Sequence, residues 1–156
     1  MHPYRNFILM IAVSATLMFG LMYLNTYQLS HVWFSQTRLF MTFIMAGSMA
    51  LTMLFFMRHM YKHRQANVAI VIGSVALMGL GFWLVRSQAT VGDVAWMKAM
   101  IPHHSIAILT SERANISDPR VRKLADDIIE AQLREIEEME VLIRDINDQS
   151  SETSHK

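Results

Sequence analysis

The chain has 156 residues, of which 53% are hydrophobic and 17% are charged, whereas an ordinary globular domain has about 45–50% apolar and about 25% charged residues. No Asp or Glu precedes Asp93, so the net charge of +1 is a balance between a basic first part and an acidic last part. This division excludes a single soluble domain. The chain also lacks a basic, aromatic-rich pattern, which excludes nucleic acid as the expected partner.

Three uncharged apolar segments occupy the basic part of the chain, residues 1–86. A helix that crosses a bilayer needs about 20 residues, and each segment is long enough. We therefore predict transmembrane helices over residues 7–24, 39–57 and 66–85, with the lipid bilayer as their surroundings. The first segment exceeds the apolar stretch of about 7–15 residues that is typical of a cleaved signal peptide, so we expect it to remain as a helix.

The basic residues in the short loops predict the orientation, because Lys and Arg favour the cytoplasmic side. The side of the N-terminus carries Arg5, Arg58, Lys62 and Arg64, and the opposite side carries Arg38 and Arg86. The N-terminus is therefore expected in the cytoplasm. In a bacterial inner membrane the acidic C-terminal part then lies in the periplasm. The absence of cysteine fits such an oxidising compartment.

Methionine is enriched in the membrane part. Five methionines follow one another at a spacing of four residues along the second predicted helix, which places them on one face. They are Met41, Met45, Met49, Met53 and Met57. One interpretation is a packing stripe, because methionine fills gaps between helices well. The other is a path of soft thioether ligands for Cu(I).

After a linker over residues 87–91, the chain is predicted to form a helical hairpin over residues 92–147 and a disordered tail over residues 148–156. Thr90 and Asp93 form a capping-box pattern at its start. Asp118 is expected to cap the second helix, with Pro119 in its first turn. The fold class is thus all-α. A hairpin has too little core to stand alone, so we expect a homodimer that forms a four-helix bundle, or coverage by the membrane helices.

Two groups of polar and sulfur-containing side chains are expected to meet inside this hairpin. If the turn is centred near residue 117, His104 lies level with about residue 130, to within about one turn. Met, His and carboxylate side chains without thiolate favour copper. The alternative is a buried hydrogen-bond network without metal. The candidate ligands are Met97, Met100, His103, His104, Gln132, Glu135 and Met139.

The same residues carry a family resemblance. The segment Met-Ile-Pro-His-His at residues 100–104, followed by Gln132, Glu135 and Met139, resembles the signature of the bacterial family DUF305, a domain of unknown function. The resemblance covers residues 92–146. It implies a ferritin-like helical fold and kinship with periplasmic copper-binding proteins of the CopM type. Longer members carry two His-His half-repeats, whereas this chain has one, which favours the dimer.

The expected function is therefore binding of copper, as Cu(I) or Cu(II), or of silver, in periplasmic metal homeostasis or resistance. No pairing of a nucleophile with a base is apparent, so no enzymatic activity is expected. One alternative is a structural or regulatory membrane protein whose hairpin only dimerises. A second is a ferritin-like metal oxidase, which would require several Glu and Glu-x-x-His motifs.

Overall fold

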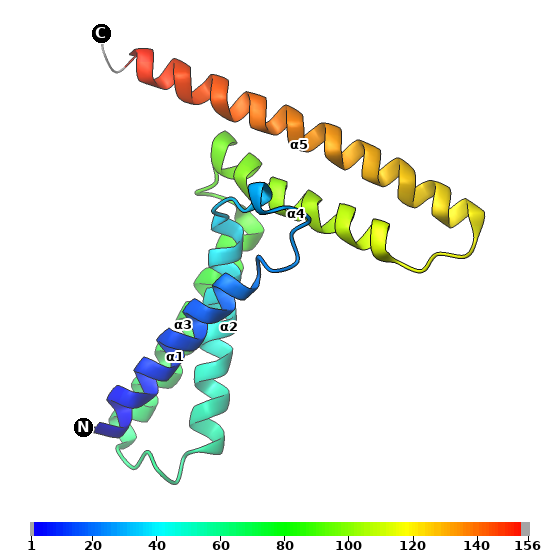
Figure 1. Ribbon diagram of the computed structural model, residues 1–156. Helices are drawn as coiled ribbons and strands as arrows, with labels where there is room; N and C mark the ends of the chain where they lie inside the picture. The colour runs from blue at the N-terminus through cyan, green and yellow to red at the C-terminus, as the bar shows by residue number, and fades with distance from the viewer. Residues whose placement is uncertain (1, 154–156) are drawn as a thin grey trace. The chain divides into compact units, whose positions relative to one another are not determined.

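A computed structural model describes residues 2–153 of the chain. Its described residues form five α-helices and one short 3-10 turn, without a strand, so the all-α prediction is confirmed (Figure 1). The chain divides into two compact units. One consists of Met1–Met22 and Gln36–Thr90, and the other of Tyr23–Ser35 and Val91–Lys156.

The first unit contains three helices, α1 (His2–Leu21), α2 (Gln36–Phe56) and α3 (Arg64–Ser87). All three are long and apolar enough to cross a membrane, which confirms three candidate spans. Many of their large apolar side chains point outward, such as Leu9 and Phe55. This outward apolar surface suits helices whose solvent is lipid.

The helices α2 and α3 approach each other closely at two glycines. A Cβ atom on Gly81 would lie 2.8 Å from the backbone oxygen of Phe40, and one on Gly47 would lie 2.8 Å from that of Ser74. Small residues at such positions let two membrane helices pack backbone against backbone. The α2–α3 pair is therefore the tightly packed part of this unit.

The start of α1 is joined to the connection between α2 and α3. The hydroxyl of Tyr4 donates a hydrogen bond to Oδ1 of Asn67 (2.8 Å) and accepts one from the backbone N–H of His63 (3.0 Å). The ring of Tyr61 packs against those of Tyr4 and Phe7. These contacts hold the N-terminus and the second loop at the same end of the three helices.

The second unit contains the hairpin of α4 (Asp93–Arg113) and α5 (Pro119–Thr153), which lie side by side and antiparallel (Figure 1). The predicted cap of α5 is confirmed, because Asp118 Oδ1 accepts a hydrogen bond from the backbone N–H of Arg120 (2.8 Å). The start of α4 differs from the prediction. Its N-cap is Gly92, without a side-chain cap, so Thr90 lies outside the helix and forms no capping box.

The C-terminal residues also differ from the prediction. A disordered tail was expected from residue 148, but α5 continues to Thr153. No Gly or Pro follows Pro119 to end the helix, and the hydroxyl of Ser150 donates to the carbonyl of Ile146 one turn earlier (2.7 Å). Residues 154–156, including His155, lie outside the described part of the chain.

The core of the second unit joins both hairpin helices to the segment Tyr23–Ser35. This segment includes the 3-10 turn η1 (Leu29–His31), and its Tyr27 and Trp33 pack against the hairpin core. The hairpin is therefore covered on one flank by the loop between the first two membrane helices. The buried core residues are Met97, Ile101 and Ile108 of α4 and Ile136, Met139 and Ile143 of α5.

Candidate metal centre

His104 lies at the interface between the two hairpin helices. Its Nδ1 is 3.3 Å from Oε2 of Glu135, and 12% of the His104 side chain is exposed, against 44% of the Glu135 side chain. The imidazole is therefore largely enclosed, while the carboxylate lies at the edge of the interface. One member of each predicted group, His104 and Glu135, therefore meet in the structure.

The two helices meet at a different register from the predicted one. His104 contacts Glu135, which lies five residues beyond the predicted position 130 on α5. Helical side chains lean toward the N-terminus of their own helix. In an antiparallel pair, His104 leans away from the turn and Glu135 leans toward it. These opposite directions bring the two side chains together.

Nδ1 of His104 is buried and has no hydrogen-bond partner among the described residues. The nearby carboxylate is within ion-pair distance, but the pair lacks the alignment of a hydrogen bond. Burial lowers the pKa of His104, the nearby Glu135 raises it by a smaller amount, and His103 lowers it further. The ring is therefore neutral at pH 7. A neutral imidazole with an unpaired nitrogen is the form that binds metal ions.

Gln132 lies beside this pair on α5. Its Nε2 is 3.5 Å from Oε2 of Glu135, at the long limit of a hydrogen bond, one helical turn away. An amide that donates to a carboxylate helps to orient it, as partners around a metal ligand commonly do. Gln132 and Glu135 thus form a polar group at the edge of the interface.

The three predicted methionines belong to the hairpin core. Met97 and Met139 are nearly fully buried, at 5% and 6% exposure, and lie in one cluster contributed by both helices. Met100 is partly buried and packs against that cluster. Met97 and Met100 precede His104 by seven and four residues, which places them on the same side of α4. Thioether and imidazole groups are therefore gathered in this part of the hairpin.

His103 does not join the group. Its side chain is exposed, and its ring centroid lies 6.3 Å from that of His104, with the planes at 53°. Adjacent residues of a helix are separated by about 100°, so only one of the two rings can face α5. Among residues 2–153, no three His, Asp or Glu side chains come together in an arrangement that would hold a metal ion. The donors in one hairpin are thus mainly thioethers and one imidazole.

A second buried histidine was missed by the sequence analysis. His31 in η1 is 6% exposed, and its Nδ1 lies 3.0 Å from Oγ of Ser105, which is fully buried in α4. The same hydroxyl accepts a hydrogen bond from the backbone N–H of Tyr27 (2.6 Å). Burial lowers the pKa of His31, while Glu140 raises it by less. Only the unexpected contact of the first loop with α4 reveals this group, because no sequence spacing connects residues so far apart.

We expect Ser105→Ala to weaken the attachment of Tyr23–Ser35 to the hairpin by about 1–3 kcal/mol, because it leaves a partly buried N–H and a buried imidazole nitrogen without their partner. Hydrogen exchange of Tyr27 and its neighbours in the full chain measures this loss. Thr110→Ala is the matched control, because its exposed hydroxyl bonds only within α4. Equal protection in both variants would contradict the prediction.

Comparisons with known proteins place the hairpin within a described domain. The sequence model of the domain of unknown function DUF305 matches residues 93–156. An uncharacterized protein, L153, of Acanthamoeba polyphaga mimivirus is 31% identical over 106 residues, which cover 67% of this chain and 68% of that protein. This alignment is longer than the domain match, so it also includes residues that precede Asp93. No solved structure matches the chain.

Proposed function

The chain belongs to the DUF305 family, and we propose that it is a membrane protein whose α4–α5 hairpin binds copper, or silver, in metal homeostasis or resistance. The observation that carries this proposal is the enclosed and neutral imidazole of His104, whose Nδ1 lacks a hydrogen bond, in a hairpin whose core contains methionines. A nitrogen that is buried without a partner is costly unless something binds it. A metal ion satisfies it.

The donor set supports copper over other metals. The chain has no cysteine, and the described residues offer no cluster of three His or carboxylate side chains such as zinc and iron sites use. Soft thioethers favour Cu(I), and imidazole binds either oxidation state. We propose Met97, Met100 and Met139 as Cu(I) ligands, His104 as the principal ligand for both states, and the exposed His103 as a weaker ligand for both states. Gln132 and Glu135 then orient the ligands or bind occasionally.

A second copy of the chain is proposed to complete the site. On α5, three exposed apolar residues and Glu135 are spaced seven residues apart, so they form one row beside the interface. This row consists of Val121, Ile128, Glu135 and Leu142, with the exposed Leu124 adjacent to it. A partner hairpin that packs on the row would bury this apolar surface and the edge of the site together. The result is a ferritin-like four-helix bundle with two-fold symmetry.

The proposed side of the membrane for the hairpin rests on two observations, the distribution of basic residues and the membership of the second unit. Tyr23–Ser35 and the hairpin belong to one compact unit, which supports their lying on the same side of the membrane. The excess of basic residues at the N-terminus and in the second loop supports a cytoplasmic location for that end. The hairpin then faces the opposite side, which is the periplasm in a bacterial inner membrane.

A titration of the purified full chain in detergent with Cu(I), against a coloured competing chelator, tests the copper proposal. We expect a sub-micromolar hairpin site whose contribution disappears in the double variant His103→Ala/His104→Ala, while Cu(II) binding weakens in parallel. An amount and an affinity of bound Cu(I) that are the same in the wild-type chain and in the double variant would overturn the proposal and favour a hairpin that only dimerises. Oxygen consumption with added Fe(II) would favour the metal oxidase instead.

A further inference from the structure

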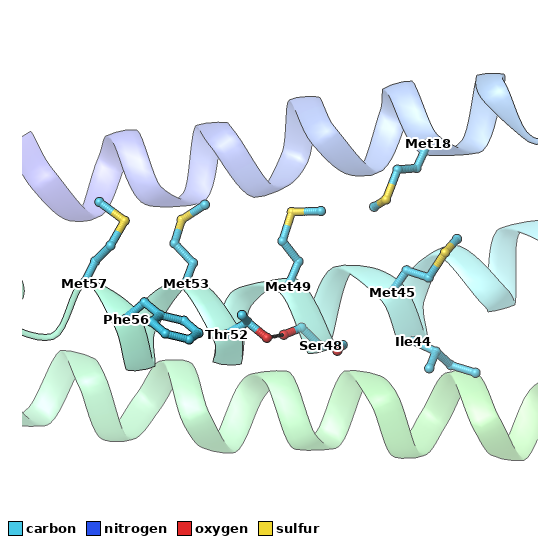
Figure 2. Close-up of a pocket in the computed structure, with 9 residues that line it drawn as sticks. All are labelled: Met18, Ile44, Met45, Ser48, Met49, Thr52, Met53, Phe56 and Met57. Atoms are coloured by element: carbon cyan, nitrogen blue, oxygen red, sulfur yellow. Dashed lines mark hydrogen bonds between the residues drawn. The ribbon is translucent and has the colours of Figure 1, made fainter.

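A groove runs along α2 on the side that faces α1, with a volume of about 630 Å³. Figure 2 shows the side chains of Met49, Met53 and Met57 extending from α2 toward α1, and Met18 extending from α1 toward α2. Met45 lies one turn before Met49 along the same wall. Five thioether sulfurs from two membrane helices therefore border one groove.

Packing alone does not explain this arrangement. The closely packed surface of α2 is the one against α3, where Gly47 and Gly81 bring the helices together. The methionines line the side toward α1 instead, where space remains between the helices. Met53 and Met57 pack in part against a hydrophobic cluster of the three helices. All five methionines nevertheless border the groove and remain only partly buried.

The chemistry of the groove favours a soft metal ion. Its other polar groups are the hydroxyls of Ser48 and Thr52, and that of Thr52 already donates to the carbonyl of Ser48 (2.9 Å). Thioether sulfur is a ligand that selects Cu(I) among biological metals. Side chains one turn apart have Cβ atoms about 5–6 Å apart, so two neighbouring flexible methionines can bracket one ion. The remaining methionines of α2 and Met18 of α1 supply further sulfurs.

We infer that this methionine groove binds soft monovalent metal ions, Cu(I) and Ag(I), within the membrane part of the protein. Successive pairs of thioethers provide equivalent positions about 6 Å apart along α2. The exposed His59, Met60 and His63 follow Met57 in the second loop. Their imidazole and thioether groups are further borderline and soft ligands for an ion at that end of the groove. The inference does not depend on metal binding by the hairpin.

Silver retained by the full chain in detergent micelles tests the inference, because Ag(I) needs no reductant. The background variant His103→Ala/His104→Ala removes the hairpin histidines. We expect this chain to keep bound silver after desalting, measured by mass spectrometry of the metal. The further change Met49→Leu/Met53→Leu is expected to weaken that binding at least about tenfold, because leucine preserves volume but removes the sulfur.

The control Met10→Leu/Met78→Leu removes two membrane methionines that do not line the groove, and it is expected to keep the silver. Helix content by circular dichroism identifies any variant that fails to fold. Absence of silver in the histidine-free chain, or equal silver in the groove and control variants, would overturn the inference. If the hairpin binds no metal while the groove retains silver, only the proposed function of the hairpin is overturned, and the inference for the groove stands.

Discussion

Replacing His104 by alanine is expected to weaken Cu(I) binding by more than about 100-fold. Loss of a residue that merely orients a ligand costs about 10–100-fold in affinity, and His104 is the one imidazole enclosed beside Glu135. His103→Ala is the matched comparison, because this neighbouring ring is exposed. We expect it to weaken binding by about tenfold or less. Competition titrations of the two single variants measure the difference, and equal losses would contradict the assignment of His104 as the principal ligand.

The pH dependence of binding follows from the same residue. Because the pKa of His104 is below its usual value of 6.5, protons compete with the metal only in more acidic solution. Copper affinity is therefore expected to stay constant from pH 7.5 to 6.5 and to fall as the pH decreases through the lowered pKa. His104→Ala should remove this component of the pH profile. A loss of affinity that begins well above pH 6.5 would contradict the lowered pKa.

The lowered pKa has a second consequence for the metal-free protein. Above pH 6.5 the imidazole is neutral in both the folded and the unfolded chain, so its protonation does not reduce the free energy of unfolding. As the pH falls below 6.5, the unfolded chain binds the proton first. The free energy of unfolding of the hairpin therefore decreases as the pH falls from 6.5 to the lowered pKa of His104. The lowered pKa of His31 reduces the free energy of unfolding in the same direction.

Replacing Ile128 by arginine is expected to convert a dimer of the full chain into a monomer. Ile128 lies in the exposed apolar row of α5, one heptad before Glu135. In a two-fold symmetric interface each copy contributes the new charge, and buried like charges cost several kcal/mol. A loss of that size raises the dissociation constant by more than about 100-fold. Light scattering with correction for bound detergent measures the protein mass, which should fall to that of one 18.0 kDa chain.

Val141→Arg is the control for the dimer, because Val141 is about as exposed but lies on the outer face of α5, away from the row. It should leave the mass of the wild-type protein unchanged. A wild-type protein that has the mass of one chain at micromolar concentration would contradict the dimer. A dimer that survives Ile128→Arg would show that a different surface pairs the two copies.

The sequence by itself determined the elements whose causes are local. Long segments without charge predict membrane helices because a bilayer excludes unpaired charge, and the structure has three such helices in nearly the predicted places. The start of α5 was likewise predictable. The adjacent residues Asp118 and Pro119 supply a cap and a first-turn residue, and the Asp118 cap forms as expected.

Only the tertiary structure decided which of these elements meet, because contacts between distant residues depend on packing rather than on spacing. It joined Tyr23–Ser35 to the hairpin core through Ser105, and it paired His104 with Glu135 through the opposite lean of their side chains. It also left His103 exposed and a groove open beside the methionines of α2. Periodicity gives the face of a helix on which a residue lies, but the neighbour of that face is set by the fold.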